Sequence, residues 1–491
     1  MFYPTFEEVK ELSKTHNIIP VSMEVYADME TPISLFKRFA QGQCFLLESV
    51  EGGEKWARYS FIGRKPYLTL SSRNGVCVLN SKGEKQTKEG NPVDILRELM
   101  REYKSAQIRN LPRFTGGAVG FIGYDIVRFY EDLPLSLTDD LELPDCEFML
   151  TDEVIAYDHL KQKIHIIVNL HTDEHLERSY ITTVERIKEI YQEINDTRWK
   201  IYQPVVNYEK VSPAIEFNSN VTKEEFCNAV VKAKEYIRDG DIFQVVLSQR
   251  FEVGVLSEPL DVYRALRIIN PSPYMYYLGF NDFILIGSSP ETLVRVENGI
   301  VETCPIAGTR RRGMDENEDR RLEEDLLSDR KELAEHTMLV DLGRNDVGKI
   351  SQFGTVKVIN PMHIERYSHV MHIVSNVAGA QRDDKDAFDA LAAIIPAGTV
   401  SGAPKIRAME IIDELEKFKR GPYAGALGYV GFDGTMDMCL TIRTLIFKGN
   451  KAYLQAGAGI VADSVPEREH DETLRKAEAL IKAIREAGDI R

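Results

Sequence analysis

The sequence predicts an α+β protein whose sheets are antiparallel. In the second half of the chain, short apolar runs typical of buried strands alternate with longer helical patterns, as at Val245–Ser248, Phe283–Gly287 and Ala452–Ala456. Hairpin-like segments also follow one another closely, at Leu427–Phe432, Thr441–Lys448 and Lys451–Ala456. Because tight hairpins join antiparallel strands, these segments favour antiparallel sheets over a doubly wound parallel sheet.

The first part of the chain contains strand patterns, a glycine-rich segment and one helix. Buried strands are predicted at Cys44–Leu47, Tyr67–Leu70 and Lys163–Asn169. The segment Thr115–Gly123 is rich in glycine, but no helical pattern follows it. A strand with close backbone approach is therefore favoured over a nucleotide-binding loop. Apolar side chains at helical spacing predict a helix over residues 174–195.

An irregular stretch from Asp196 to Asn220 marks the predicted boundary between two regions, residues 1–200 and 221–491. The second region opens with a capping box, in which Thr222 is the N-cap of a helix and Glu225 is its third residue. Further helices are predicted at about 316–342, 386–395, 404–416 and 466–487.

Composition and charge limit the classes of function. The 491 residues carry a formal net charge of −16, from 61 Lys and Arg against 77 Asp and Glu, which disfavours a nucleic-acid binder. The six cysteines are scattered without a C-x-x-C pair, so neither a disulfide framework nor a structural zinc site is expected. The N-terminus lacks a secretory pattern and no run of about 18 apolar residues occurs, so we expect a cytoplasmic protein without a membrane segment.

Two of the predicted helices carry glutamates three residues apart, Glu332 with Glu335 and Glu469 with Glu472. This spacing places each pair on one side of its helix. One interpretation is a solvated acidic face that also suits the helix N-terminus. The other is a Mg²⁺ site, because hard cations bind carboxylate oxygens together with water and an anionic substrate. The spacing leaves both interpretations open.

A cationic side chain and a glycine-rich turn add to this pattern. Arg443 lies in a strand-like run, on the same side as Thr441 and Leu445, and needs a carboxylate partner if it is buried. That partner can be a protein side chain or a ligand. The glycines of Gln455–Ile460 can bring backbone N–H groups against an anion or form a plain tight turn. With the glutamates, these features predict a pocket for a small dianion.

Six longer segments carry a resemblance to a known family: Asp241–Arg250, Gly287–Glu291, Pro305–Arg310, Glu335–Asp346, Ala397–Lys405 and Gly457–Gly459. Over essentially the whole chain the sequence resembles the chorismate-utilising enzymes, and most of all the large subunits (component I) of anthranilate synthases. The resemblance implies a sandwich of antiparallel sheets with helices packed outside. It also implies that residues 221–491 bind chorismate, and that residues 1–200 carry regulatory tryptophan-binding elements and part of the partner surface.

The resemblance assigns roles to individual residues. Glu335 and Glu472 would hold Mg²⁺, with Glu332 and Glu469 beside them. Chorismate would be bound by Gly308, Thr309, Tyr423, Arg443, Gly457, Ala458 and Gly459. The catalytic residues would be His372, Thr399 and Gln244, although the apolar run around His372 alone favours a packed histidine. Two like charges about 4 Å apart repel by about 4 kcal/mol at an effective dielectric of about 20, so glutamates without Mg²⁺ would exclude a dianionic substrate.

Two positions separate the activities of this family. Isochorismate and salicylate synthases carry a water-activating lysine where this chain has Gln244, and an amide is no base at neutral pH. Aminodeoxychorismate synthases carry a nucleophilic lysine where this chain has Ala307. The resemblance therefore implies a lyase that adds ammonia at C2 of chorismate and then eliminates pyruvate. The product would be anthranilate, in the first step of tryptophan biosynthesis.

The resemblance also implies feedback control and a partner. Leu46–Ser49 and Asn270–Met275 resemble tryptophan-binding elements, although each alone is more typical of a strand end or a proline-stiffened turn. L-tryptophan would contact Ser49, Pro273, Tyr274 and Met275. No cysteine stands in a glutaminase pattern, so ammonia is expected from a glutamine amidotransferase subunit, in a heterotetramer of two large and two small subunits. The rival functions are an aminodeoxychorismate synthase large subunit and an inactive tryptophan sensor.

Overall fold

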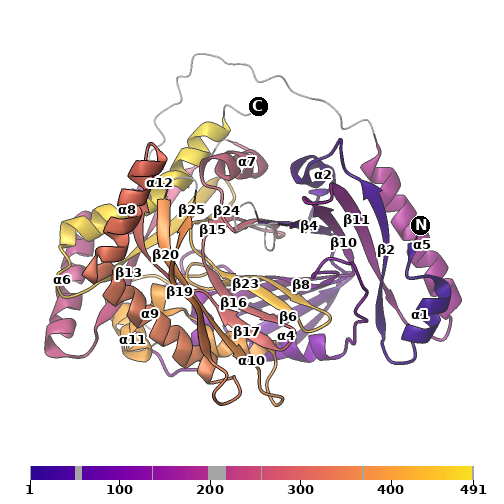
Figure 1. Cartoon of the computed structure of the whole chain (residues 1–491), viewed down its shortest axis with the longest axis horizontal. Coiled ribbons are helices and arrows are strands. Elements are labelled where there is room, and N and C mark those ends of the chain that lie inside the picture. Colours follow the sequence, from indigo (N-terminus) through magenta and orange to yellow (C-terminus); the bar gives the residue numbers. More distant parts are fainter. Residues whose placement is uncertain are drawn as a thin grey trace.

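The computed structural model describes residues 2–49, 58–134, 137–196, 217–255, 257–367 and 370–488. The chain forms two large antiparallel sheets with helices around them (Figure 1). The first sheet has the strand order β1 (Phe2–Tyr3), β2 (Ile18–Tyr26), β11 (Lys163–His171), β10 (Glu153–Asp158), β4 (Tyr59–Arg64), β3 (Cys44–Glu48), β14 (Tyr274–Gly279), β15 (Ile284–Ser289), β24 (Thr444–Lys448), β25 (Lys451–Ile460), β13 (Gln244–Gly254) and β12 (Phe217–Ser219), with β21 (Gly402–Ala403) also paired to β13.

The second sheet has the strand order β18 (Ile306–Arg311), β20 (Val370–Ala380), β17 (Ile300–Thr303), β16 (Thr292–Glu297), β23 (Met436–Leu440), β22 (Ala426–Gly431), β8 (Gly117–Ile122), β9 (Cys146–Thr151), β5 (Leu68–Arg73), β6 (Val76–Ser81) and β7 (Glu84–Glu89), with β19 (Lys357–Arg366) also paired to β20. Every strand pairing within the described residues is antiparallel apart from isolated bridges, as the hairpin-like spacing predicted.

An aromatic core lies between the two sheets. Phe45 and Phe61 of the first sheet pack in one cluster with Phe121 and Leu427 of the second. Side chains of a strand alternate between its two faces, so each sheet also buries an outer face, and helices cover it. The predicted α+β sandwich is therefore confirmed.

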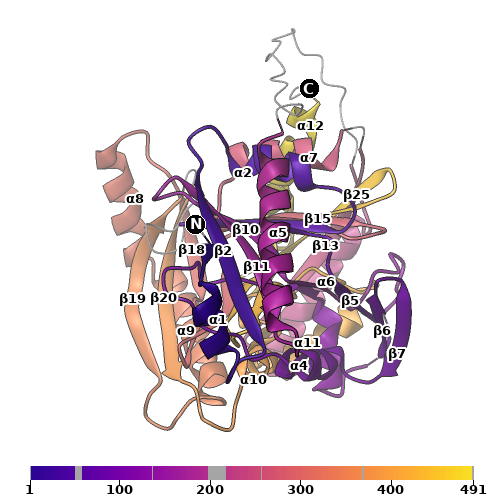
Figure 2. The same ribbon diagram turned by 90° about the vertical axis from the view of Figure 1, so that its right-hand side faces the viewer.

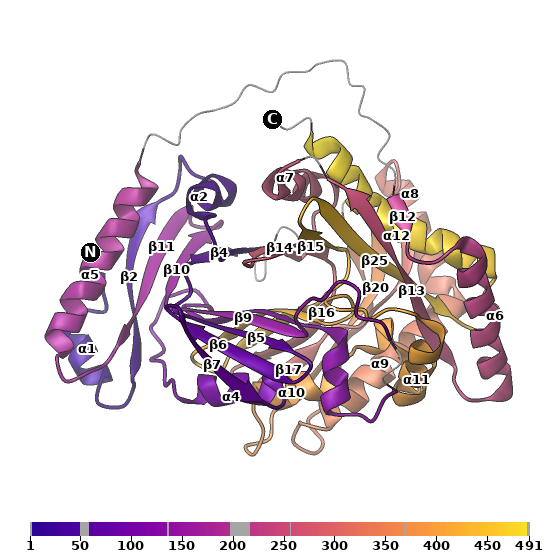
Figure 3. The ribbon, with the colours of Figure 1, turned by 180° about the vertical axis from the view of Figure 1, so that it is seen from behind.

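The helices cover the outer faces of both sheets. The first sheet is covered by α1 (Phe6–Leu12), α2 (Pro32–Phe39), α5 (Leu176–Ile194), α7 (Pro259–Ile269) and α12 (Pro466–Ala487). Figure 2 shows α5 along β2 and β11. The second sheet is covered by α4 (Pro92–Arg101), α9 (Arg330–Gly348) and α10 (Ala387–Ile394), and α4 and α10 are seen together in Figure 3. In contrast, α11 (Lys405–Leu415) packs against β13 and β21 of the first sheet. The remaining elements are α6 (Lys223–Asp239), α8 (Glu316–Ser328) and the 3₁₀ turns η1 (Tyr124–Phe129) and η3 (Gly398–Val400). No helix in the described ranges is long and apolar enough to cross a membrane.

Most predicted helices are found, and one is divided. The capping box at Thr222 and Glu225 opens α6 as predicted. The helix predicted over 316–342 is wrong as one element, because Asp329 ends α8 in an extended conformation and begins α9. The Asp329 carboxylate accepts from the backbone N–H groups of Lys331 and Glu332, which is the usual N-cap arrangement.

The strand predicted around Arg443 is also interrupted. β23 ends at Leu440 and β24 begins at Thr444, and Arg443 lies between them with a φ of +49°. A left-handed residue redirects the chain, so the expected alternation of Arg443 with Thr441 and Leu445 does not apply.

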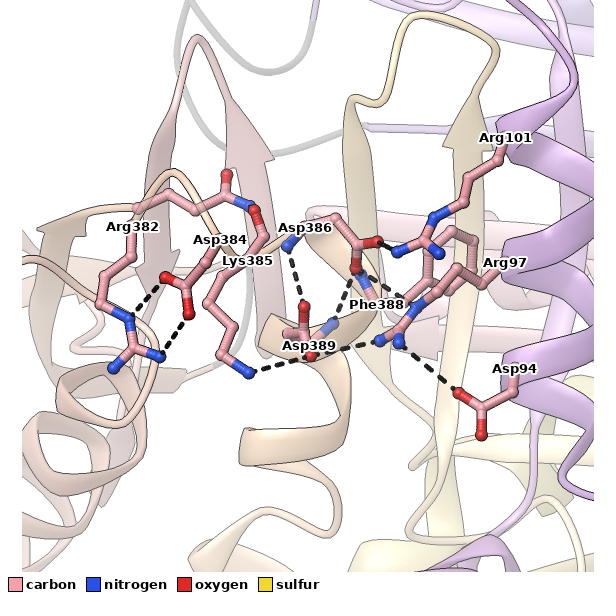
Figure 4. A network of polar contacts seen from close by, with 10 residues as sticks. Asp94, Arg97, Arg101, Arg382, Asp384, Lys385, Asp386, Phe388 and Asp389 are labelled. Carbon is pink, nitrogen blue, oxygen red and sulfur yellow. Dashed lines mark hydrogen bonds and ion pairs between the residues drawn. The ribbon is translucent and has the colours of Figure 1, made fainter.

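Both regions on either side of the predicted boundary contribute to both sheets. β3 pairs with β14 in the first sheet, and β8 pairs with β22 in the second. Ion pairs between α4 and the start of α10 add a further connection (Figure 4). There Arg101 donates to Asp386, while Arg97 lies 3.4 Å from carboxylate oxygens of both Asp386 and Asp389. The boundary stretch itself falls largely outside the described residues, so the division into two regions stays a prediction.

Candidate active site

β18 and β20 bring Gly308, Thr309 and His372 together. The register shifts between Ala307 and Thr309, and Gly308 adopts a φ of +68° that favours glycine. A Cβ at this position would also lie 3.0 Å from Leu326 and 3.2 Å from the Glu332 carboxylate. This turn directs the Gly308 carbonyl toward His372, whose Nδ1 lies 2.9 Å from that oxygen and 3.1 Å from Thr309 Oγ1.

The surroundings of His372 determine its protonation. A carbonyl oxygen only accepts hydrogen bonds, so Nδ1 carries the proton and Nε2 is left as an acceptor. Burial lowers the pKa of His372 to about 4, and the charges of Arg443 and Lys476 act in the same direction. His372 is therefore a neutral imidazole at neutral pH, with Nε2 available as a base.

The pKa of Glu291 is shifted in the opposite direction to that of His372. It lies in the connection from β15 to β16, where the chain passes from the first sheet to the second, and Thr399 Oγ1 of η3 donates to its Oε1 over 2.9 Å. Burial raises the pKa of Glu291 to about 8, so the carboxyl is largely protonated at neutral pH. A protonated carboxyl is a potential proton donor. Sequence reasoning included Glu291 in a motif but gave it no role.

Gln244 and Glu335 meet beside the glycines of β25. Gln244 Nε2 donates to Glu335 Oε1 over 3.2 Å. A Cβ on Gly459 would lie 2.5 Å from the same Nε2, so a side chain there would displace the amide. Gln244 is 3% exposed, and its Oε1 has no hydrogen-bond partner among the described residues. A buried acceptor without a partner favours a ligand that can donate to it.

The two predicted pairs of glutamates both carry signs of crowded negative charge. Burial raises the pKa of Glu332, and Glu335 raises it further. Burial likewise raises the pKa of Glu469, with Glu472 acting in the same direction. A cation would relieve this repulsion, and the donors are all oxygens, which suits Mg²⁺.

No three His, Cys, Asp or Glu side chains in the described part of the chain are arranged to hold a metal. A cation here would therefore have to complete its coordination with water and substrate. That is how Mg²⁺ is usually bound, so the residues present fit this ion.

Lys476 is a site residue that sequence reasoning missed. Its Nζ lies 2.8 Å from Glu472 Oε1 and donates to the Gly457 carbonyl over 2.9 Å. Its charge also affects the pKa values of His372 and Glu291, so all three belong to one site. The signal in the sequence is the spacing of four from Glu472, which places the ammonium beside that carboxylate.

Arg443 and Tyr423 lie at the other predicted substrate positions. Of the two partners left open for a buried Arg443, a protein carboxylate and a ligand, no described residue supplies the first for this mostly buried side chain. Burial lowers the pKa of Arg443, which reflects the cost of leaving its charge without an anion. Tyr423 is buried, and its hydroxyl would lie 2.7 Å from a Cβ on Gly457. A buried guanidinium of this kind favours an anionic ligand at Arg443.

Ser49, Pro273, Tyr274 and Met275 line a separate cavity between the two sheets. The space within its outline, open solvent included, is about 430 Å³, and most of its lining is apolar. Tyr274 donates from its hydroxyl to Asp437 over 2.8 Å, and the same hydroxyl lies 3.0 Å from Thr292 Oγ1. Because Thr292 directly follows Glu291, one hydrogen bond separates the cavity lining from the candidate acid.

The comparisons with known proteins agree with this geometry. Residues 42–482 match the family model described as chorismate binding enzyme. The chain is 64% identical to anthranilate synthase component 1 of Acetivibrio thermocellus over the whole of both chains. It is 49% identical to the protein of the same name from Aquifex aeolicus, over 98% of this chain and 97% of that one.

Solved structures show the same relationship. The crystal structure of anthranilate synthase component I from Streptococcus pneumoniae is 41% identical, with a TM-score of 0.77 over 93% of this chain and 98% of that one. The menaquinone-specific isochorismate synthase of Escherichia coli, 19% identical, shares the fold with a TM-score of 0.70 over 98% of each chain. The site geometry, the family match and these relatives together show that the chain belongs to the chorismate binding enzyme family, as an enzyme that uses chorismate.

Proposed function

We propose that the chain forms anthranilate from chorismate and ammonia, with release of pyruvate and water. The observation that carries this proposal is the opposite shift in pKa of two buried groups near Lys476. The carboxyl of Glu291 keeps its proton at neutral pH, and the imidazole of His372 stays unprotonated at Nε2. Groups whose pKa values are pushed apart in this way serve as acid and base in one site. The names of the relatives with 64% and 49% identity support the same product.

The chemistry divides between these groups. Arg443 binds a carboxylate of chorismate, and Tyr423 with the Gly457–Gly459 backbone confines the ring. Glu335 and Glu472 hold Mg²⁺, which when bound polarises the ring carboxylate. Glu291 protonates the C4 hydroxyl as it leaves as water, while ammonia adds at C2.

His372 completes the reaction. Its free Nε2 removes the proton from C2, the bond from C3 to the enolpyruvyl oxygen breaks, and the ring becomes aromatic as pyruvate departs. Gln244 contributes at the ammonia step, because its unpaired Oε1 can accept an N–H hydrogen bond and its amide cannot deprotonate water.

Ammonia comes, in this proposal, from a glutamine amidotransferase subunit in a heterotetramer of two large and two small subunits. Glutamine hydrolysis of that kind needs a thiolate nucleophile. Burial raises the pKa of all six thiols of this chain, so none is prepared for nucleophilic attack. The word component in the relatives' names supports a partner.

L-tryptophan is the proposed occupant of the cavity at Ser49 and Pro273–Met275. The cavity offers an apolar body for an indole ring and a charged end at Arg113 and Asp437 for the amino-acid groups. Tryptophan would inhibit by binding more tightly to a conformation in which Glu291 is displaced, through Tyr274 and Thr292.

The decisive experiment combines the purified chain with chorismate, Mg²⁺ and concentrated ammonium at mildly alkaline pH, and follows anthranilate fluorescence. Fluorescence that disappears with a chelator and declines with tryptophan is the expected result. Formation of a para-substituted product would instead indicate an aminodeoxychorismate synthase. Tryptophan binding with chorismate left intact would indicate a sensor without catalysis.

A further inference from the structure

The buried guanidinium of Arg420 contacts three segments of the candidate site, although Arg420 has no role in the proposed reaction. Arg420 lies between α11 and β22, and none of its side chain is exposed. Its Cζ lies 4.7 Å from the ring centre of Tyr124 and 5.7 Å from that of Tyr423. A cation over aromatic faces is attracted by both rings, so Arg420 supports Tyr423 from behind.

The hydrogen bonds of Arg420 reach the segments that carry two more site residues. Its Nη2 donates to the Val246 carbonyl over 2.7 Å, and its Nη1 to the Val400 carbonyl over 2.8 Å. Val246 follows Gln244 by two residues on β13, and Val400 follows Thr399 directly in η3. One planar group therefore fixes the distance between the backbones that present Gln244 and Thr399.

The remaining donors of Arg420 bind Glu416, over 2.9 Å from Nε and 2.6 Å from Nη2. Glu416 Oε1 also accepts from the backbone N and the hydroxyl of Ser248, which extends the contact along β13. A buried ion pair is a weak source of stability, because packed apolar side chains of similar volume stabilise a core at least as well. The Arg420–Glu416 pair is therefore better explained by the segments that it holds together than by the stability that it adds.

We propose that Arg420 is a positioning residue, which holds β13, η3 and Tyr423 in the arrangement that lets Gln244, Thr399 and Tyr423 act on one substrate. The residue touches no substrate itself. This inference rests on the proposed function for its turnover assay, but its effect on chorismate binding can be measured independently.

Arg420→Lys tests the proposal, since lysine keeps the charge and a bond to Glu416 but cannot donate to both carbonyls in a plane. Arg128→Lys is the matched control. Arg128 is also mostly buried and bonds to Asp125, Asp413 of α11 and the Pro134 carbonyl, without contact to the site. At a temperature where circular dichroism shows both variants folded, kcat of Arg420→Lys should fall by about tenfold or more, and that of Arg128→Lys by less than about twofold.

A double-mutant cycle separates positioning from general stability. If Arg420 acts through Thr399, combining Arg420→Lys with Thr399→Ala should cost much less than the product of the single losses in kcat, whereas Arg128→Lys should combine multiplicatively. Multiplicative losses in both cycles, or equal kcat in the two lysine variants, would overturn the proposal. If Arg420→Lys does not fold, Glu416→Gln is scored by the same criteria.

Equilibrium binding of chorismate keeps the inference distinct from the proposed reaction. A wild-type chain that makes no anthranilate would refute the proposed function only. Arg420→Lys should still bind chorismate about fivefold more weakly than Arg128→Lys, through the displacement of Tyr423. Equal affinities of Arg420→Lys and Arg128→Lys for chorismate would overturn the proposed role of Arg420.

Discussion

Replacing Glu291 with glutamine removes an acid while preserving its shape. Burial raises the pKa of Glu291 from its usual 4.5 to about 8, and the hydrogen bond from Thr399 opposes this only in part. At about 1.4 kcal/mol per pKa unit, folding shifts the balance toward the neutral carboxyl by about 5 kcal/mol relative to the unfolded chain. Glutamine keeps an acceptor oxygen for Thr399 Oγ1 but cannot protonate a departing hydroxyl.

The activity of Glu291→Gln should therefore fall sharply. General acids contribute about 10²–10⁴-fold to a rate, so kcat for anthranilate formation should drop by that factor. The assay follows anthranilate fluorescence with free ammonia held constant, because ammonium titrates in the same range. Wild-type activity should decline above about pH 8 as Glu291 loses its proton, and the residual activity of the variant should lack this decline.

The same pKa makes the stability of the wild type depend on pH. The unfolded chain releases this proton near pH 4.5 and the folded chain near pH 8. The contribution of Glu291 is therefore fully present below pH 4.5 and is lost as pH rises to about 8. Relative to Glu291→Gln, the wild-type free energy of unfolding should fall by about 1.4 kcal/mol per pH unit in this window, measured by denaturant unfolding.

Glu147→Gln is the matched control. Burial raises the pKa of Glu147 to about 8 as well, but this side chain lies on β9 and contacts no residue of the candidate site. The control should reproduce the pH-dependent change in stability and keep full turnover. Full turnover in Glu291→Gln, or a decline above pH 8 that persists in that variant, would refute the assignment of Glu291 as the acid.

Three further substitutions test other groups. Glu335→Gln should abolish Mg²⁺-dependent anthranilate formation, and wild-type rates in this variant would exclude Glu335 as a ligand. Arg443→Gln should raise the KM for chorismate by about 10–100-fold, because a charge-assisted hydrogen bond contributes about 1.5–3 kcal/mol. An unchanged KM would show that Arg443 does not bind a carboxylate of chorismate. Thr292→Val should leave the affinity for tryptophan, measured by calorimetry, nearly unchanged but weaken its inhibition of turnover. Undiminished inhibition would show that the hydrogen bond between Tyr274 and Thr292 does not link the cavity to Glu291.

The sequence predicted the elements of the fold better than the turns between them. Periodicity and caps located α6 and α12, since their signals are local: Thr222 with Glu225 for one, and Pro466 with a regular apolar stripe for the other. Arg443 was placed in a strand because apolar neighbours on both sides continue the pattern. Nothing local shows that this residue adopts a positive φ, which depends on how β23 and β24 are joined to different sheets.

Candidate residues in spaced pairs could be recognised from local spacing, whereas isolated candidates were found only where the resemblance to a known family named them. Glu291 and Arg420 were not assigned a role at all. Glu332 with Glu335 and Glu469 with Glu472 stand out by their spacing, which the structure places on α9 and α12. Glu291 is a single carboxyl after a proline, and its pKa depends on burial that only the assembled sheets create. Arg420 is likewise one of many arginines, and its contacts with Val246 and Val400 join residues far apart in the sequence.

The position of Glu291 connects catalysis with the proposed regulation. The cavity at Tyr274 lies between the sheets, and Glu291 lies where the chain crosses from β15 of the first sheet to β16 of the second. A ligand that alters the spacing of the sheets must move this crossing, because its two ends belong to different sheets. In the proposed regulation, the site would then lose its aligned acid without any contact between the ligand and chorismate. Inhibition by a ligand in this cavity, as proposed, would need no long pathway, since Glu291 directly precedes Thr292, the hydrogen-bond partner of Tyr274 in the cavity lining.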